Sequence, residues 1–243
     1  MIKLPKVIGH RGARNHAPEN TLAAFRKAAE LGITWVEFDV MLTKDLVPII
    51  MHDEQLDRTT NGHGEVANFL YSDINQLDAG QWFSSTFINE KIPRFTDVLD
   101  CLSRYQLGAN VEIKPTPGKD IITANKIISL VQSQWPLHLP PPLISSFSLE
   151  SLFSVRKIDS TVPMGLLLDT WREDWLEIAL ELRCFSIHLN FAILTPERAN
   201  AIKNAGYKLL VYTVNDINTA LMLWSWGVDS IFSDCADEII KSC

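Results

Sequence analysis

The stretch KVIGHRGARNHAPENTLAAF (residues 6–25) begins as an apolar strand and ends as the first turns of a helix. Leu22, Phe25 and Ala29 recur at helical spacing, and Gly32 is a stop signal. The segment PENT (18–21) predicts the helix start, with Asn20 as the N-cap residue. The stretch therefore reads as one strand–helix unit whose strand ends at H-R-G (10–12).

The same unit recurs along the chain, because short β-branched runs alternate with amphipathic stretches. The apolar runs cover residues 6–10, 35–40, 109–114, 143–147, 164–169, 184–190, 208–214 and 229–234. Eight alternating strands and helices predict an α/β fold of the (β/α)₈ TIM-barrel type. The 243 residues agree with a single barrel domain over residues 1–243.

The interval between the second and third runs is too long for one crossover. Residues 95–106 have the pattern of the crossover helix, and VMLTKDLVPIIMHD (40–53) predicts a β-hairpin with its turn at residues 44–46. Counting back from this turn places His52 roughly opposite Asp39. Residues 53–94 are then a small insertion after the second strand, over one mouth of the barrel.

Composition excludes several classes of protein. The chain has 22 basic and 29 acidic residues, a net charge of −7, which disfavours a nucleic-acid partner. No apolar run approaches the roughly 18 residues of a membrane span, so stable membrane insertion is not expected. The four cysteines are scattered and no signal-peptide pattern is present, which predicts a cytoplasmic protein with reduced thiols. The sequence leaves open whether the protein is a monomer or a dimer.

Three carboxylates fall near the carboxyl ends of predicted strands, where barrel active sites lie. Glu37 and Asp39 point to the same side of one strand, and Glu112 lies on the next barrel strand. Crowded, partly buried carboxylates repel each other unless a cation offsets their charge. Oxygen-only ligation favours Mg²⁺ or Ca²⁺ as the cofactor.

Cationic and imidazole side chains occupy the same strand ends. Arg11 and Lys114 are placed to bind an anion beside the metal, which is the pattern of phosphate chemistry. His10 and His52 supply groups that titrate near neutral pH, as general acid–base catalysis requires. The structural alternatives are simple salt bridges, such as an Arg11–Glu37 ion pair.

These motifs together resemble the glycerophosphodiester phosphodiesterase family, most closely its short cytoplasmic bacterial members. The matching segments, in order, are H-R-G (10–12), P-E-N-T (18–21), E-F-D (37–39), H-D (52–53), E-I-K (112–114) and V-Y-T-V-N (211–215). Each segment alone is weak, but the ordered set is specific and spans essentially the whole chain.

The resemblance implies metal-dependent hydrolysis of glycerophosphodiesters, the deacylated head groups of phospholipids, to sn-glycerol 3-phosphate and an alcohol. It implies metal binding by Glu37, Asp39 and Glu112, and acid–base catalysis by His10 and His52. Further residues implied in substrate binding are Arg11, Lys114, Phe147 and Tyr212, the last at a position where many members carry tryptophan.

Other interpretations remain open at this point. A lysophospholipase D or a phosphoinositide-type phospholipase on the same barrel would need an apolar landing surface, which residues 69–71 and 82–83 could supply. A non-catalytic barrel would lack a histidine or a metal carboxylate, and this chain lacks none. For Asn215, capping of the following helix competes with substrate contact, and Glu19 is weighed as an indirect support of the site.

Overall fold

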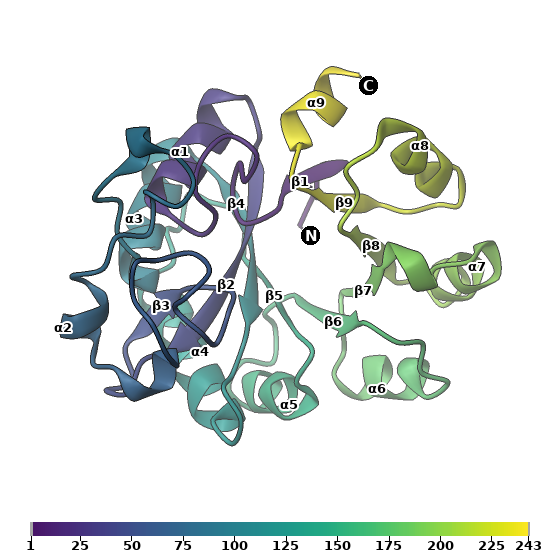
Figure 1. The fold of residues 1–243 in the computed structure, drawn as a ribbon. Helices are drawn as coiled ribbons and strands as arrows, with labels where there is room; N and C mark the ends of the chain where they lie inside the picture. Colours follow the sequence, from purple (N-terminus) through teal and green to yellow (C-terminus); the bar gives the residue numbers. More distant parts are fainter. Residues whose placement is uncertain (1, 243) are drawn as a thin grey trace.

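The computed structural model describes residues 2–242, which form a closed barrel of eight parallel strands (Figure 1). The barrel strands are β1 (Val7–Gly9), β2 (Trp35–Leu42), β4 (Gly108–Ile113), β5 (Leu143–Ser146), β6 (Met164–Leu168), β7 (Ser186–Asn190), β8 (Lys208–Tyr212) and β9 (Ser230–Ser233). Neighbouring strands pair in this order, and β1 pairs with both β2 and β9, which closes the barrel. The predicted (β/α)₈ TIM barrel is confirmed.

Helices surround the barrel and follow its strands (Figure 1). They are α1 (Leu22–Glu30), α3 (Phe95–Tyr105), α4 (Asp120–Gln134), α5 (Leu149–Ile158), α6 (Trp175–Glu181), α7 (Pro196–Asn204), α8 (Ile217–Ser225) and α9 (Ala236–Lys241). The main core lies between these helices and the outer face of the strands. Because parallel strands are covered on both faces, their sequences read as nearly continuous apolar runs.

A second, smaller core fills the inside of the barrel. Ile8, Trp35, Leu143, Leu210 and Phe232 pack there, and residues 2 and 4 lie against them. Apolar packing therefore occupies the amino-terminal part of the interior. The polar residues of the strands are left at the carboxyl ends, where they line an open pocket.

The predicted hairpin is present, with β3 (Pro48–Ile50) antiparallel to β2. The backbone N–H of Met51 donates to the carbonyl of Asp39 at 3.0 Å. Met51 is therefore directly opposite Asp39. His52, which was predicted to lie roughly opposite Asp39, is the next residue along the chain.

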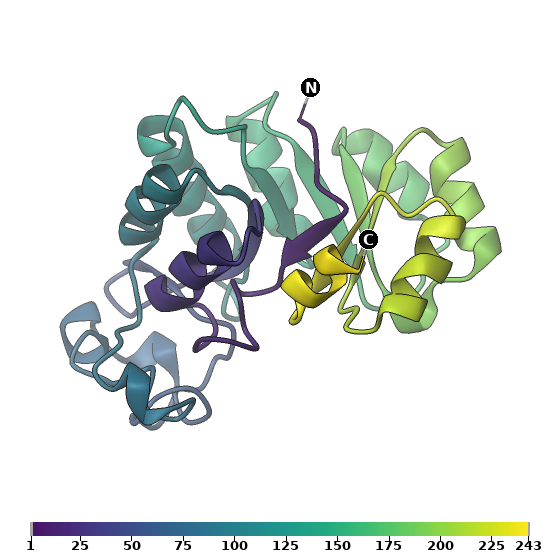
Figure 2. The same ribbon diagram turned by 90° about the horizontal axis from the view of Figure 1, so that it is seen from above.

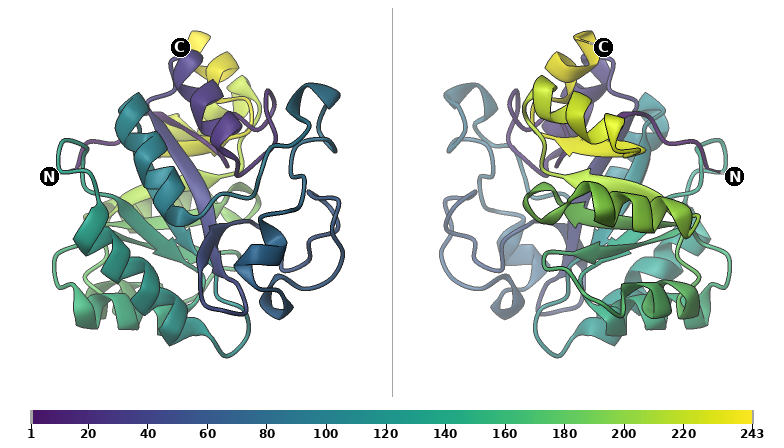
Figure 3. Two further views of the ribbon diagram at one scale, coloured as in Figure 1. Left: turned by 90° about the vertical axis from the view of Figure 1, so that its left-hand side faces the viewer. Right: turned by 90° about the vertical axis from the view of Figure 1, so that its right-hand side faces the viewer.

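Residues 53–94 lie beside the barrel, on the side away from the N-terminus (Figures 2 and 3). They contain α2 (Tyr71–Ile74) and short 3₁₀ helices at Val66–Asn68 and Ser85–Phe87. Their own small core packs on the hairpin through Met41, Ile49, Met51, Leu56, Val66, Ile74, Ala79 and Ile92.

One helix start differs from the prediction, and at a second the structure decides an alternative that the sequence left open. Thr21, and not Asn20, is the N-cap of α1, because its Oγ1 accepts the N–H of Ala24 at 3.2 Å. Asn20 has a left-handed φ of 59° and its side chain reaches across to β2. Asp216, and not Asn215, caps α8. Asn20 and Asn215 instead bond to the carboxylates of Asp39 and Asp234, which lie on or directly after other strands.

Three cysteines, Cys101, Cys184 and Cys235, are buried free thiols, and Cys243 lies outside the described residues. Within residues 2–242, none of the helices has the length and apolar character needed to cross a membrane.

Candidate active site

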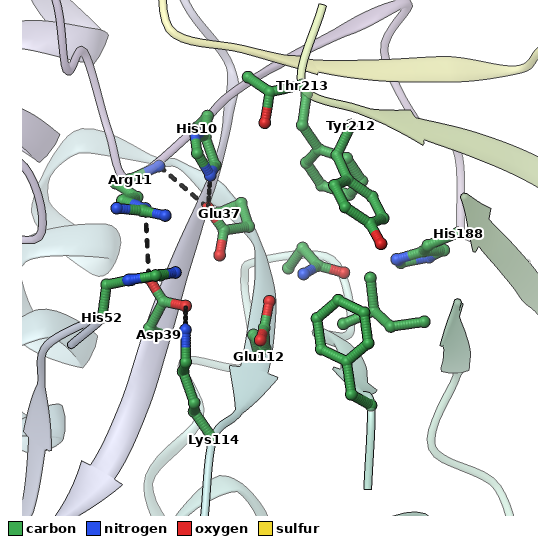
Figure 4. A pocket seen from close by; sticks show the side chains of 14 residues that line it. His10, Arg11, Glu37, Asp39, His52, Glu112, Lys114, His188, Tyr212 and Thr213 are labelled. Carbon is green, nitrogen blue, oxygen red and sulfur yellow. Dashed lines mark hydrogen bonds and ion pairs between the residues drawn. The ribbon is translucent and has the colours of Figure 1, made fainter. Parts of the chain in front are cut away.

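All nine site residues predicted from the sequence line one pocket at the carboxyl ends of the strands (Figure 4). These residues are His10, Arg11, Glu37, Asp39, His52, Glu112, Lys114, Phe147 and Tyr212. The pocket has a volume of about 150 Å³. Five further residues complete its lining, namely Asn110, Leu167, His188, Thr213 and Phe232.

The three carboxylates form a tight group. Glu37, Asp39 and Glu112 each offer an oxygen, and these atoms lie within 4.8 Å of one another. Burial and then the charge of Asp39 raise the pKa of Glu112 to about 8. Burial and the same carboxylate raise the pKa of Glu37 well above its usual value. The group thus has more negative charge than its surroundings compensate, and it is able to bind a metal ion.

Asp39 differs from the other two carboxylates because cations flank it. Burial alone would raise its pKa, but the charges of Arg11 and Lys114 outweigh burial and lower it. Lys114 Nζ lies 3.8 Å and Arg11 Nε 3.6 Å from its oxygens, and Asn20 Nδ2 donates to it at 2.9 Å. Asp39 is therefore held ionised and in a defined orientation.

Arg11 connects the first strand to this group through its backbone and its side chain. Its backbone N–H donates to Glu37 Oε2 at 3.0 Å, which a φ of 53° allows. The guanidinium bonds to Glu19 at 2.7 Å, so the ion pair with Glu37 considered from the sequence is replaced by one with Glu19. Gly12, with a φ of 85°, is required by packing, since a Cβ there would lie 2.8 Å from that of Ala24.

Each of the two predicted acid–base histidines has a carboxylate within hydrogen-bond distance of its Nδ1. His10 Nδ1 lies 2.6 Å from Asp234, and His52 Nδ1 lies 2.6 Å from Asp53. An ionised carboxylate only accepts, so each Nδ1 carries the proton and each Nε2 is left as an acceptor. Burial lowers the pKa of both histidines, and Asp234 opposes this shift for His10. Both imidazoles are therefore neutral at neutral pH.

A cluster of arginines around Glu19 joins the insertion to the barrel. Glu19 is buried and accepts hydrogen bonds from Arg11 at 2.7 Å, from Arg14 at 2.9 Å and from Arg58 at 2.7 and 3.0 Å. Arg58 also donates to Asp53, the partner of His52. Burial alone would raise the pKa of Glu19, but the arginines, Arg58 foremost, lower it to about 2.

We expect Glu19→Gln to destabilise the protein by roughly 2–3 kcal/mol at pH 7, because the arginines lose their shared counter-charge. Glu19 has a lower pKa in the folded protein than its ordinary 4.5, so its contribution is present above pH 4.5 and is lost as the pH falls towards 2. Urea unfolding at pH 7 and at about pH 3 measures this difference.

The exposed carboxylate Glu30 on α1 offers a matched control, since its partners are the surface residues Lys27 and Arg26. Glu30→Gln should change stability by less than about 0.5 kcal/mol. Equal effects of the two substitutions at pH 7 would contradict the structural role assigned to Glu19.

Aromatic side chains form the wall of the pocket opposite Arg11 and His52, where Figure 4 shows Tyr212 beside His188. The rings of Phe147 and Tyr212 are perpendicular, with centroids 6.0 Å apart. The hydroxyl of Tyr212 donates to the carbonyl of Leu168 at 3.0 Å, which holds its ring against the pocket. Phe147 is 46% exposed, so this wall continues to the mouth.

Several residues of the site had been given no definite role from the sequence. Asp234 is the last residue of the predicted strand 229–234, and the sequence assigns it no role. The interpretation of Glu19 and Asn20 as mainly a helix start is incomplete, because these side chains bond to Arg11 and Asp39. Asn215 also belongs here, since its side chain donates to Asp234 at 2.8 Å. The available signal for Asp234 was a polar residue at the end of a predicted strand, whereas no signal in the sequence marked Arg58.

The model of the glycerophosphoryl diester phosphodiesterase family matches residues 10–238 of the chain. The chain belongs to this family. A glycerophosphodiester phosphodiesterase from Caldanaerobacter subterraneus subsp. tengcongensis is 35% identical over 241 residues, which cover 97% of this chain and 96% of the relative. The family predicted from the ordered motifs, and with it a phosphoric diester hydrolase, is confirmed.

Solved structures of the same family superimpose closely. A phosphodiesterase from Oleispira antarctica, in complex with the product sn-glycerol-3-phosphate, has a TM-score of 0.95 and 37% identity, covering 98% of this chain and 96% of the other. A glycerophosphodiester phosphodiesterase from Agrobacterium tumefaciens has a TM-score of 0.81 and 30% identity, covering 98% and 100%.

Proposed function

We propose that this glycerophosphodiester phosphodiesterase hydrolyses glycerophosphodiesters to sn-glycerol 3-phosphate and an alcohol in a metal-dependent reaction. The observation that carries the proposal is one pocket in which a group of three carboxylates faces two His–Asp pairs. The product held by the Oleispira antarctica phosphodiesterase supports the substrate class.

Glu37, Asp39 and Glu112 would hold the metal, and their all-oxygen donor set favours Mg²⁺ or Ca²⁺. The raised pKa values of Glu37 and Glu112 support this fit, because a divalent cation supplies the charge that these buried carboxylates lack. When bound, such an ion polarises a phosphoryl oxygen and offsets the charge that develops on it.

Arg11 and Lys114 flank Asp39 and bind the phosphate of the substrate. Arg11 Nε makes no hydrogen bond in the described part of the chain and lies 3.6 Å from an oxygen of Asp39, so this donor still has the capacity to hydrogen-bond an anion. Phe147 and Tyr212 contact the apolar parts of the substrate from the opposite wall.

His10 and His52 transfer the protons. One neutral imidazole accepts at Nε2 the proton of the attacking hydroxyl, which belongs to water or to the glycerol itself. The other histidine takes up a proton from solvent and donates it from Nε2 to the leaving alcohol. Asp234 and Asp53 orient the rings and stabilise the protonated forms. Residues 53–94 carry Asp53 and Arg58, and we assign this small insertion, which lies beside the barrel, to covering one edge of the active-site mouth.

The purified protein with Mg²⁺ or Ca²⁺ should release sn-glycerol 3-phosphate from glycerophosphocholine or glycerophosphoethanolamine, and a chelator should stop the release. Product analysis over a panel of head groups and metals checks this. No release with any pair would refute the proposal, and higher activity on lysophospholipid vesicles would favour the phospholipase alternative. Cytoplasmic location and the monomeric or dimeric state stay predictions from the sequence.

A further inference from the structure

The inside of the barrel is polar immediately below the three carboxylates. Asn110, Ser145, Ser186 and His188 are all buried, with at most 1% of each exposed. Asn110 Nδ2 donates to Ser145 Oγ at 2.9 Å, and Ser186 Oγ lies 2.8 Å from His188 Nε2. Two polar pairs thus occupy a position that apolar side chains fill nearer the amino-terminal end.

In each pair, one side-chain polar atom makes no hydrogen bond. In the described part of the chain, Asn110 Oδ1 and His188 Nδ1 are buried and have no hydrogen-bond partner. Buried polar atoms in folded proteins nearly always have a partner, because leaving one unpaired is costly. Both residues line the active-site pocket, so a molecule in that pocket could supply the partner.

The position of His188 depends on a glycine on the neighbouring strand. A Cβ on Gly165 would lie 2.3 Å from His188 Nε2, so only glycine at this position leaves room for the ring. Figure 4 shows His188 across the pocket from His10, with its ring turned into the barrel. Asn110 precedes Glu112 by two residues on β4, so it shares the inward face with that carboxylate.

The chemistry of the two atoms selects a hydroxyl group. Asn110 Oδ1 only accepts, which excludes an anionic group as its partner. Burial lowers the pKa of His188 to about 3, so its ring is neutral, and a Ser186 hydroxyl can serve either tautomer. A hydroxyl can donate to Asn110 Oδ1 and accept from His188 Nδ1–H at the same time.

We propose that Asn110 and His188 form a subsite that binds the terminal hydroxyl of the substrate's glycerol part. This inference rests on the proposed function for its substrate class. The glycerol is the small, constant half of the substrate and fits the enclosed end of the pocket, whereas the variable alcohol extends past Phe147 at the mouth. The competing source of the same chemistry is an ordered water molecule.

The test combines variants with a substrate that lacks the hydroxyl. We compare kcat/KM for a glycerol phosphodiester and for its propane-1,2-diol analogue in the wild type and in Asn110→Leu and His188→Phe. The wild type should lose roughly 10- to 100-fold on the analogue, whereas each variant should show a ratio near one. An unchanged ratio in the variants would overturn the proposal in favour of water or a structural role.

Thr123→Val on α4 is the matched control, since it removes a buried hydroxyl that lies outside the pocket lining. This variant should keep the wild-type ratio. If Asn110→Leu or His188→Phe fails to fold, calorimetric binding of sn-glycerol 3-phosphate and of propane-1,2-diol phosphate to the wild type still tests whether the terminal hydroxyl is bound.

The calorimetric binding measurement also distinguishes the hydroxyl subsite from the proposed function, because binding can be measured without hydrolysis. A preference of roughly tenfold or more for sn-glycerol 3-phosphate without any hydrolysis would refute only the proposed function. Hydrolysis with equal binding of both phosphates would refute only the hydroxyl subsite.

Discussion

Glu112→Gln should lower metal-dependent hydrolysis by at least about 100-fold and should also make the metal-free protein more stable. Activity falls because a neutral amide replaces one of three carboxylates that would hold the cation. Stability rises by on the order of 1–3 kcal/mol at about pH 8, because one crowded buried charge is removed. Steady-state kinetics and thermal unfolding without metal measure the two effects.

The pH dependence identifies the cause of the stability gain. Glu112 has a pKa of about 8 in the folded protein, against an ordinary value of 4.5, so the folded state keeps a proton that the unfolded chain has released. Its contribution to stability is full below pH 4.5 and is lost as the pH rises through 8.

Wild type and Glu112→Gln should therefore have similar unfolding temperatures near pH 5 and differ most at about pH 8. Adding Mg²⁺ or Ca²⁺ should raise the unfolding temperature of the wild type more than that of the variant. A variant that is less stable at pH 8, or that keeps full activity, would contradict the assignment of this carboxylate.

His10→Ala and His52→Ala should each reduce kcat by about 10²- to 10⁴-fold, which is the contribution of a general acid or base. Each substitution removes the Nε2 that faces the pocket and leaves the three carboxylates in place. Metal affinity should therefore change much less than turnover, and kinetics together with metal titration measure the difference.

His63→Ala is the control for the histidine variants, because this residue lies on the insertion with 85% of its side chain exposed. It should keep wild-type turnover. If His10→Ala and His52→Ala were folded and as active as His63→Ala, the acid–base pair would have to be sought elsewhere in the pocket.

Prediction from the sequence worked best where the signal is local. Each barrel strand is a short apolar run, and its burial on both faces makes that run visible without knowledge of the fold. The start of α7 is equally local, since Thr195 caps it and Pro196 follows. The positions of Glu37 and Asp39 follow from the alternation of side chains along one strand.

The two helix caps show where local reasoning stops. Asn20 and Thr21 are both good N-cap residues, and the sequence contains no reason to prefer either. The contact between Asn20 and Asp39 decides the matter, and it forms only once β2 lies beside the start of α1. The same holds for Asn215, which bonds to Asp234 across the loops that follow two strands.

The sequence by itself determined the strands, the order of the motifs and the kinds of chemistry at the strand ends. Only the closed barrel decided which groups act together, because side-chain pairing depends on distance across the mouth. His10 and Asp234 are 224 residues apart along the chain, yet their side chains meet because β1 pairs with β9. Glu19 likewise meets Arg58 only when the insertion lies against the barrel. Their side chains then form hydrogen-bonded ion pairs at a buried position.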